Sequence, residues 1–302
     1  MAYINVESKK IYIEEYGKEN TKSIVIFHGG PAASCRGFEN IATLLGVKYH
    51  VICFDQYGCA RSDTIPENEP FGMTEHIDLI DKMRVVLGIK SWVIIGHSYG
   101  GTLACLYAYT YPNSTDSIIY IGASFDYGMA AKVQSAYLIP YFKRISSHEG
   151  LYKCIELLTT DFPTRKDTHD FYRTSIVPLI KDFREVCFYH KSIEELNNVP
   201  SIKIDSQPNP DNVLVKNNIH TKKIREGGEI YGDFYLYLEN TDKQTLYIVG
   251  HCDPMGCDEI QDRYLNTAQK GMLVKFNSSG HFPHQEEPQR FVETIISFVD
   301  NL

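Results

Sequence analysis

Eight short, mostly apolar runs recur along this chain, and helical patterns separate the later runs. Continuous apolar runs are typical of strands that are buried on both faces of a parallel sheet. The alternation predicts an α/β fold with a doubly wound, mostly parallel eight-stranded sheet, opened by an antiparallel hairpin and covered by helices on both faces. The predicted strands are Tyr3 to Glu7, Ile11 to Tyr16, Ser23 to Phe27, His50 to Phe54, Ser91 to Ile95, Ser117 to Ile121, Thr245 to Val249 and Met272 to Phe276. The predicted helices are Gly37 to Leu45, Thr74 to Leu87, Thr102 to Tyr109, Asp258 to Ala268 and Pro288 to Val299.

One stretch, from about Phe125 to Asp242, interrupts this alternation. It contains helical patterns, and strands resume only at Thr245. We therefore expect a core of residues 1–124 and 243–302 and an inserted, mainly helical cap of residues 125–242 over the strand ends. The helical patterns of the cap are Met129 to Ser146, Gly150 to Leu158 and Leu179 to Leu196, and the Pro- and Asn-rich stretch Ser206 to Pro210 follows them.

The segment Gly96-His97-Ser98-Tyr99-Gly100 joins a predicted strand to a predicted helix. Glycine at both ends permits the strained backbone and the close chain approach that a sharp turn needs. This pattern at such a junction is typical of a nucleophile elbow, which leaves a serine hydroxyl exposed. The alternative is a plain Gly-Ser turn with a solvated hydroxyl. We expect Ser98 to be a catalytic nucleophile.

A serine hydroxyl is a poor nucleophile at neutral pH, so it needs an imidazole base and a carboxylate that fixes the imidazole tautomer. His281 follows a predicted strand, at the edge where sites in such sheets form, and we expect it to be the base. Asp253 also follows a predicted strand, and the order Ser, Asp, His is that of an α/β-hydrolase. Asp126 follows the strand before the cap and is the alternative acid.

Two backbone N–H groups are the expected oxyanion hole. One belongs to Tyr99, directly after the nucleophile. The other comes from the turn His28-Gly29-Gly30-Pro31, where glycines let the backbone approach a ligand; Gly30 is the better candidate and Gly29 the second. A plain Gly-Pro turn is the alternative.

Metal binding is a further alternative for one segment. His251, Cys252, Asp253 and Cys257 are all possible ligands, but their spacing is not that of a zinc site and no second half matches them. We expect no metal and no cofactor.

The composition narrows the range of partners. The net charge is −8, and the 30 Lys and Arg residues form no basic stripe, so we expect no nucleic acid and no membrane as partner. The eight cysteines form no Cys-x-x-Cys pair, and we expect buried, reduced thiols. Met1 to Glu7 lacks the basic and apolar regions of a signal peptide, and no apolar run reaches spanning length, so a cytoplasmic protein is expected. The sequence sets no expectation for the oligomeric state.

Four motifs resemble those of the proline iminopeptidase subgroup of α/β-hydrolases. They are His28 to Pro31 against HGGPG, Asp55 to Ser62 against DQRGxGxS, Gly96 to Gly101 against GxSxGG, and Gly280 to Pro288 against SHxPHxEEP. The resemblance implies a triad of Ser98, Asp253 and His281, an oxyanion hole at Gly30 and Tyr99, and no cofactor. It also implies release of an N-terminal residue from a short peptide.

The chain departs from the family pattern where specificity is decided. Ala32 replaces the last glycine of HGGPG, Tyr57 replaces the arginine of DQRG, and Tyr99 replaces the family's tryptophan. By position in these motifs, Gly29, Tyr57 and His284 are expected at the substrate; His284 is expected to order its loop or line the pocket. Family members hold the substrate's amino group with acidic residues of the cap. No local motif transfers that role to one residue among Glu149, Glu156, Glu185, Glu229 and Glu239.

The leading hypothesis is therefore a serine hydrolase that acts on a small amide or short peptide, as an aminopeptidase of the proline iminopeptidase type. The alternative is a carboxylesterase, thioesterase or lactonase, because the same triad cleaves esters and a cap rich in Tyr and Phe could hold an acyl chain. A hydrolase-like binding protein without activity is a third hypothesis, which the complete triad disfavours. Serine at position 98 disfavours chemistry with an aspartate nucleophile.

Overall fold

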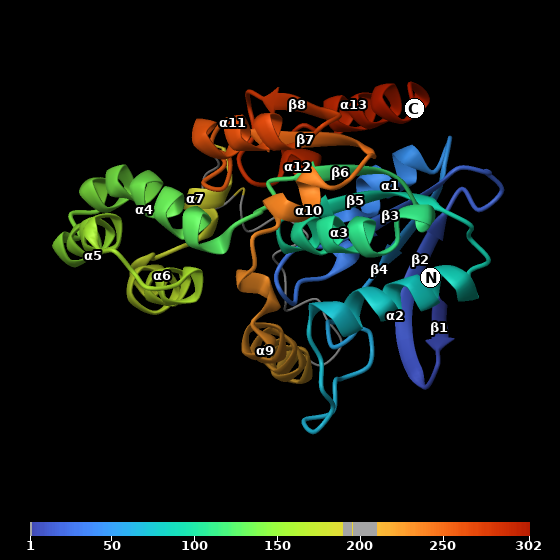
Figure 1. Ribbon diagram of the computed structural model, residues 1–302, viewed down its shortest axis with the longest axis horizontal. Coiled ribbons are helices and arrows are strands. Elements are labelled where there is room, and N and C mark those ends of the chain that lie inside the picture. The colour runs from blue at the N-terminus through green and yellow to red at the C-terminus, as the bar shows by residue number, and fades with distance from the viewer. Residues whose placement is uncertain (1, 190–194, 196–209) are drawn as a thin grey trace.

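An eight-stranded sheet runs through the computed structural model, which describes residues 2–189, 195 and 210–302 (Figure 1). The strand order is β1-β2-β4-β3-β5-β6-β7-β8. β1 and β2 form an antiparallel hairpin, β2 is antiparallel to β4, and all other neighbours are parallel. The strands are β1 (Ala2–Val6), β2 (Lys9–Tyr16), β3 (Ser23–Phe27), β4 (His50–Phe54), β5 (Trp92–His97), β6 (Thr115–Ile121), β7 (Gln244–Gly250) and β8 (Gly271–Phe276). The predicted fold class is confirmed.

Helices cover both faces of this sheet. Successive strand residues point to opposite faces, so Val25 and Phe27 of β3 belong to one apolar cluster and Ile24 and Ile26 to another. The first face is covered by α2 (Met73–Val86), α3 (Tyr99–Thr110), α10 (Tyr235–Glu239) and α11 (Asp258–Thr267). The second face is covered by η1 (Cys35–Phe38), α1 (Glu39–Leu45) and α13 (Pro288–Asp300). Two short helices, η2 (Pro112–Ser114) and α12 (Pro283–Glu286), lie in connections.

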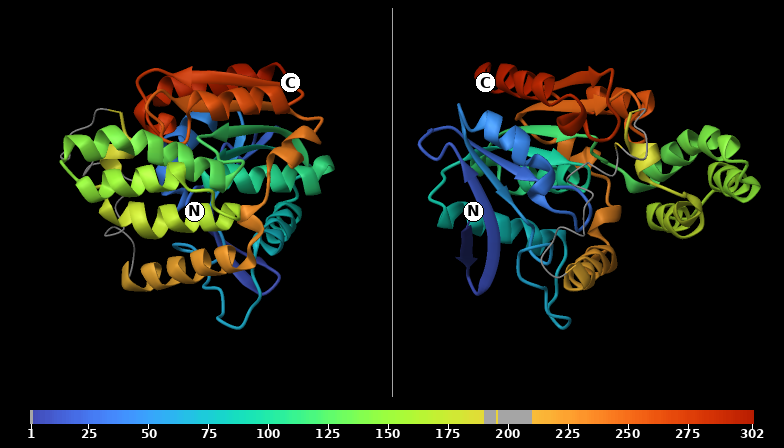
Figure 2. Two further views of the ribbon diagram at one scale, coloured as in Figure 1. Left: turned by 60° about the vertical axis from the view of Figure 1, so that its left-hand side comes forward. Right: turned by 180° about the vertical axis from the view of Figure 1, so that it is seen from behind.

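A helical lobe follows β6 and stands off one end of the sheet (Figures 1 and 2). It contains α4 (Tyr127–Arg144), α5 (His148–Thr159), α6 (Arg165–Phe171), the π-helical turn η3 (Tyr172–Ile176), η4 (Val177–Leu179) and α7 (Arg184–Cys187). The lobe has an apolar cluster of its own, which includes Leu138, Phe142, Cys154, Leu157 and Tyr172. Helix α9 (Pro210–Gly227) and η7 (Glu229–Tyr231) then lead back to α10 and β7. An inserted helical cap is thus present between β6 and β7.

The two ends of this insertion lie side by side. The N–H of Phe234 donates to the carbonyl of Phe125 at 2.9 Å. Arg165 of α6 binds both Asp126 and Asp233, at 2.8 Å each, and Arg263 of α11 reaches Asp233 at 3.3 Å. The chain therefore leaves the sheet and returns to it at neighbouring points.

The predicted helix from Leu179 to Leu196 is not continuous in its described part. Ile180 and Phe188 are extended, and only Arg184–Cys187 forms an α-helix between them. A tertiary contact overrides the helical periodicity here. The carbonyl of Cys187 accepts the N–H of His281 at 2.6 Å, so it is not available to continue a helix. Helices α6 and α9 were not predicted; α9 begins at Pro210, a residue suited to a first helical turn. Residues 190–194 and 196–209, which include most of the predicted Pro- and Asn-rich stretch, lie outside the described residues.

Within the described ranges, no helix combines the length and apolar character that crossing a bilayer requires.

Candidate active site

Ser98 occupies a sharp turn between β5 and α3. Its backbone has φ 53° and ψ −121°, a conformation that costs a residue with a side chain on the order of 1–3 kcal/mol. Its N–H donates to the carbonyl of Ile121 at 2.8 Å, which ties the turn to β6. A Cβ on Gly100 would lie 2.1 Å from the carbonyl oxygen of Phe27, and one on Gly96 would lie 2.6 Å from that of Gly100. The glycines are thus required by close backbone contacts, and the partly exposed Ser98 follows from the turn.

His281 and Asp253 meet at the carboxyl ends of β8 and β7. His281 Nδ1 lies 2.9 Å from Asp253 Oδ1, and both residues are buried. A carboxylate only accepts, so Nδ1 carries the proton and Nε2 keeps a lone pair that can act as a base. The N–H of Met255 also donates to Oδ1 at 2.8 Å, whereas Asp253 Oδ2 is buried with no partner in the described structure. The carboxylate thus holds one tautomer of His281.

Gly122 makes room for this pair. It follows β6 directly, with φ +50°, and a Cβ there would lie 2.5 Å from Asp253 Oδ2 and 2.8 Å from His281 Nδ1. Any side chain would push the aspartate and histidine apart. Sequence reasoning missed this residue; the only available signal was a glycine at the end of a predicted strand.

His97 was also missed, although it directly precedes Ser98. Its Nε2 lies 2.9 Å from the carbonyl oxygen of His281, so Nε2–H donates there and holds the backbone of the predicted base. Burial, and then the neighbouring His281 and His284, lower the pKa of His97 well below the usual histidine value. His97 is therefore neutral, and its donor stays in place across the physiological range.

The turn after β3 passes next to Ser98. A Cβ on Gly29 would lie 3.2 Å from Ser98 Cβ, and Gly30 has a positive φ of 134°. His28 orders this turn: its Nε2 accepts from the N–H of Gln56 at 3.0 Å, so Nδ1–H donates to the carbonyl of Gly29 at 2.9 Å. Tyr99 is the first residue of α3, and the first N–H groups of a helix have no partner within the helix.

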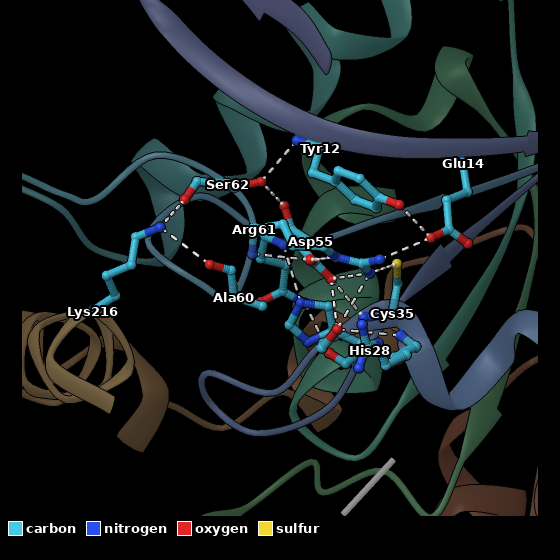
Figure 3. A network of polar contacts seen from close by, with 12 residues as sticks. Tyr12, Glu14, His28, Cys35, Asp55, Ala60, Arg61, Ser62 and Lys216 are labelled. Carbon is cyan, nitrogen blue, oxygen red and sulfur yellow. Dashed lines mark hydrogen bonds and ion pairs between the residues drawn. The ribbon is translucent and has the colours of Figure 1, made fainter. Parts of the chain in front are cut away.

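A network around Asp55 supports the loop that carries Gln56 (Figure 3). Asp55 is fully buried and accepts from Arg61 Nε at 2.6 Å. Burial raises the pKa of Asp55, but the hydrogen bond and charge of Arg61 outweigh it and hold the pKa below its ordinary value. Lys216 of α9 donates to the carbonyl of Ala60 at 3.1 Å, which fastens the same loop to the returning part of the insertion.

A cavity of about 340 Å³ contains both Ser98 and His281 in its walls. Gly29, Gly30 and His284 line it as well. The remaining walls are largely apolar: Phe38 comes from the core face, and Phe183, Cys187, Phe188 and Phe282 come from the insertion and the His281 loop. Arg184 is the charged side chain among the described lining residues, and it pairs with Asp182 at 2.6 Å. The lining in the described part of the chain contains no carboxylate.

Of the three predicted substrate-binding residues, two line this cavity and one does not. Gly29 and His284 line the cavity; His284 is buried, and its ring stacks on Phe38 with centroids 4.3 Å apart. Burial lowers the pKa of His284 to about 3. Tyr57 does not belong to the lining, because its ring packs on Phe71 and its hydroxyl donates to Glu69 at 3.3 Å. The position of Tyr57 thus does not support the expectation that it contacts the substrate.

The carboxylate of Asp126 binds partners other than His281. It accepts from the N–H of Met129 at 2.9 Å as the N-cap of α4 and pairs with Arg165, so both of its oxygens are engaged away from His281. Its ion pair with Arg165 helps to hold the two ends of the insertion together.

The five glutamates named above as possible ligands of a substrate's amino group bind other partners or are exposed. Glu229 accepts from the N–H of Met73 at 2.6 Å at the start of α2. Glu156 pairs with Lys153 and Glu185 with Arg144 on the lobe, while Glu149 and Glu239 are exposed. No group of three or more His, Cys, Asp or Glu in the described chain is arranged to hold a metal, and the segment from His251 to Cys257 is included in that statement.

Comparisons with known proteins identify the family and the fold. A family model described as alpha/beta hydrolase fold matches residues 22–288. The proline iminopeptidase of Heyndrickxia coagulans is 22% identical over 305 residues, which cover 99% of this chain and 98% of that protein. That of Xylella fastidiosa (strain Temecula1 / ATCC 700964) is 35% identical over 123 residues, and there the aligned part is 38% of this chain and only 37% of the relative's length.

Solved structures share the fold. The proline iminopeptidase-related protein from Thermus thermophilus has a TM-score of 0.72 at 15% identity, over 97% of this chain and 94% of that one. An esterase from Exiguobacterium antarcticum has a TM-score of 0.68 at 21% identity, over 99% of both chains. Because the family model extends from the start of the parallel sheet through the Ser98 turn to the His281 loop, the chain belongs to the alpha/beta hydrolase fold family, and its sequence is proline iminopeptidase-like.

Proposed function

We propose that the protein is a serine hydrolase that works through an acyl-enzyme, with Ser98 as nucleophile, His281 as base and Asp253 as the residue that orients the base. The contact of 2.9 Å between His281 Nδ1 and Asp253 Oδ1, on a cavity that also contains Ser98, carries this proposal. His281 Nε2 takes the Ser98 proton as Oγ attacks the substrate carbonyl. The His281 imidazolium formed in this step gives its proton to the leaving group. A water molecule then attacks the acyl-enzyme with His281 again as base, and the acyl group is released from Ser98.

The backbone N–H groups of Tyr99 and Gly30 are proposed to stabilise the oxyanion that forms. Donors already in place cost no reorganisation as the charge develops, and one such donor contributes about 3–4 kcal/mol. The hydrogen bonds of His28 and Gln56 support the Gly30 side of this arrangement. The helix start at Tyr99 supports the other side, because it adds the positive end of the α3 dipole.

For the substrate, we propose the N-terminal residue of a short peptide, in the manner of a proline iminopeptidase. The likeness along 99% of the chain to an enzyme of that name supports this choice. A second candidate, an ester of a small acid, is favoured by one observation: the described walls of the Ser98 cavity are rich in phenylalanine and contain no carboxylate for an ammonium group.

One panel of substrates separates the two candidates. Prolyl and alanyl anilides, their N-acetyl forms and p-nitrophenyl butyrate are compared by kcat/KM, with Ser98→Ala as the control for background hydrolysis. An aminopeptidase should lose about 10²-fold or more on acetylation, since a carboxylate that binds the ammonium would be left without its partner. Equal rates with and without the acetyl group, or ester turnover far above any anilide, would exclude the aminopeptidase and retain the Ser98 mechanism.

A further inference from the structure

A short segment of the insertion crosses directly over the loop that carries His281. Helix α7 ends at Cys187, where the lobe meets the core (Figure 1). The carbonyl oxygen of Cys187 accepts the N–H of His281 at 2.6 Å. A Cβ on Gly280 would lie 2.2 Å from the same carbonyl oxygen and 3.1 Å from the Cα of Phe188. The two backbones are therefore in direct contact, which leaves no space for a side chain at position 280.

Glu286 of α12 joins these two segments with a single carboxylate. Its Oε1 accepts the N–H of Tyr189 at 2.7 Å, and its Oε2 accepts the N–H of Gly280 at 2.8 Å. Tyr189 belongs to the insertion, whereas Gly280 belongs to the loop of the proposed base. Hydrogen bonds from a backbone N–H to a carboxylate are stronger than those between neutral groups. One side chain thus holds both segments at once.

The next residue, Glu287, makes the same kind of contact but with the core. Its Oε2 accepts the N–H of Ser278 at 3.1 Å and the hydroxyl of Ser279 at 2.6 Å, and its Oε1 pairs with Arg290 of α13 at 3.2 Å. These three partners all belong to the core. Glu287 therefore ties the His281 loop to the core, and Glu286 ties it to the insertion.

The backbone of His281 is consequently held by two different parts of the chain. Its N–H binds Cys187 of the insertion, and its carbonyl accepts Nε2–H of His97, the residue before Ser98, at 2.9 Å. An imidazole acts as a base only within hydrogen-bond reach of its nucleophile, so a small shift of its backbone lowers the rate of reaction. The insertion is thus part of the support of the proposed base.

The same segment of the insertion forms a wall of the Ser98 cavity. Cys187 and Phe188 line this cavity together with Phe282, which follows His281 in the chain. The rings of Phe188 and Phe282 stack with their centroids 4.6 Å apart and 13° between their planes. Cys187 and Phe188 form a small apolar cluster against which Phe282 packs. The wall of the cavity and the loop of the base therefore share one support.

We propose that Glu286 is a positioning residue, which links the insertion to the loop of the base so that the Phe188 wall and the His281 imidazole are aligned together. Glu286 does not belong to the described lining of the Ser98 cavity, so it acts through the backbone of Tyr189 and Gly280. A substrate group that packs on Phe188 then favours the aligned position of the base. This inference rests on the proposed serine hydrolase function.

The variant Glu286→Gln tests the link on the best substrate of the panel. An amide oxygen can accept one of the two N–H groups, but an amide NH2 group only donates, so the other N–H loses its acceptor. We expect kcat to fall by about tenfold or more, because the His281 loop is released. KM should rise as well, because the Phe188 wall is released with it. Glu156→Gln, which removes a carboxylate of the lobe paired with Lys153, should leave both constants unchanged.

Gly280→Ala breaks the same junction without a change to Glu286. Its methyl group would meet the carbonyl oxygen of Cys187, so the same combined change in kcat and KM is expected. Gly227→Ala in α9 is the matched control. A Cβ at position 227 would have only ordinary van der Waals contacts, at 3.6 Å or more, and both constants should stay as in the wild type.

Two further measurements are independent of the substrate panel. Amide hydrogen exchange of Tyr189, Gly280 and His281 should be about tenfold or more faster in Glu286→Gln than in the wild type, because their hydrogen bonds open more often. Labelling of Ser98 by a fluorophosphonate should be slower in Glu286→Gln by about the same factor as kcat, with Ser98→Ala as the unlabelled control.

The outcomes separate a positioning role from a structural one. A lower Tm in Glu286→Gln with normal kcat and normal labelling would show a merely structural role. Unchanged exchange at Tyr189 and Gly280 would show that the carboxylate does not link the two segments. Either result would overturn the proposal. A wild-type protein that neither hydrolyses the panel nor takes the label would instead refute the hydrolase function, and faster exchange in Glu286→Gln would still show the link.

Discussion

Two buried aspartates, each just beyond a strand of the same sheet, have opposite surroundings. Asp55, after β4, accepts from Arg61 Nε, from the N–H of Cys35 at 2.8 Å and from the hydroxyl of Ser34 at 2.9 Å, and both of its oxygens are engaged. Asp253, after β7, receives His281 Nδ1 and a backbone N–H on one oxygen, and the other oxygen has no partner in the described structure.

The two aspartates differ in the side chain that each one binds, which is Arg61 for Asp55 and His281 for Asp253. Arg61 is always charged, so its ion pair with Asp55 is permanent and fixes a loop (Figure 3). A histidine has no such permanent charge, and in the proposed mechanism Asp253 stabilises the imidazolium that forms on His281 during the reaction. A saturated carboxylate therefore indicates structure, and an incompletely satisfied one beside a histidine indicates chemistry. The following variants test that distinction, from the largest expected effect to the smallest.

Asp253→Asn should lower kcat by about 10⁴-fold with the fold intact, because an amide favours the wrong tautomer of His281. Ser98→Ala should be at least as severe. The measurement is kcat on the best substrate of the panel, with Tm recorded for each variant. Asp126→Asn is the matched control and should keep near-normal turnover, since Asp126 binds Arg165 rather than His281. An active Asp253→Asn beside an inactive Asp126→Asn would move the acid to position 126.

Asp55→Asn should lower the free energy of unfolding by about 3 kcal/mol, because it removes one of the two carboxylates that pair with the largely buried Arg61, the other being that of Glu14. Urea unfolding measures this loss. Asp253→Asn should change stability much less, since it breaks no pair with a permanently charged residue. A loss below about 1 kcal/mol in Asp55→Asn would contradict a structural role for this pair.

Acid should destabilise the fold in two separate pH windows. Six buried or half-buried histidines have lowered pKa values, so the unfolded chain takes up their protons first, and stability falls as the pH drops below about 6.5. They are His28, His76, His97, His169, His220 and His284. Each contributes up to about 1.4 kcal/mol per pH unit. Asp55, whose pKa is also lowered, keeps its contribution until the pH falls below about 3.9, its value when unfolded.

Urea unfolding from pH 8 to pH 5 checks the first window, because the slope of the free energy against pH counts the protons taken up. His220→Gln should flatten that slope by about one proton. An unchanged free energy of unfolding across this range would show that the histidines are not buried as neutral groups.

His97→Leu should have the smallest effect, a fall of about tenfold in kcat, because it removes one hydrogen bond to the backbone of His281. His97→Gln can place an amide N–H near the same carbonyl and should recover part of that loss. KM should stay nearly constant in both variants, since His97 acts through the predicted base. A fall confined to KM, or no difference between the leucine and glutamine variants, would argue against positioning by this hydrogen bond.

The sequence predicted the sheet well because its strands are defined locally. The expected runs Ser23 to Phe27 and His50 to Phe54 match β3 and β4 to the residue, as every position in them is buried. The helix expected from Leu179 failed because the carbonyl of Cys187 binds a residue 94 positions further along the chain, and no local pattern records such a contact.

Contacts between residues remote in the sequence also limited the prediction of the candidate site. Ser98, His281 and Asp253 could be found from motifs, each at the end of a strand. His97 and Gly122 could not, because their importance arises from distances of about 3 Å to residues remote in the sequence. Tyr57 was expected at the substrate from its motif position, yet its side chain turns toward Phe71. Motifs identify which residues gather at a site, whereas packing decides which way each side chain points.

The hydrogen bond between Phe234 and Phe125 brings the two ends of the helical insertion together, so the insertion resembles a cassette that enters and leaves the sheet through one socket. The entropy of closing a loop grows slowly with its length, so segments of different size fit the same socket at little cost to the sheet. Phe183, Cys187 and Phe188 of the cassette form part of the wall opposite Ser98. Exchange of the cassette between relatives would therefore replace part of that wall in one evolutionary step, while Ser98, His281 and Asp253 remain with the sheet.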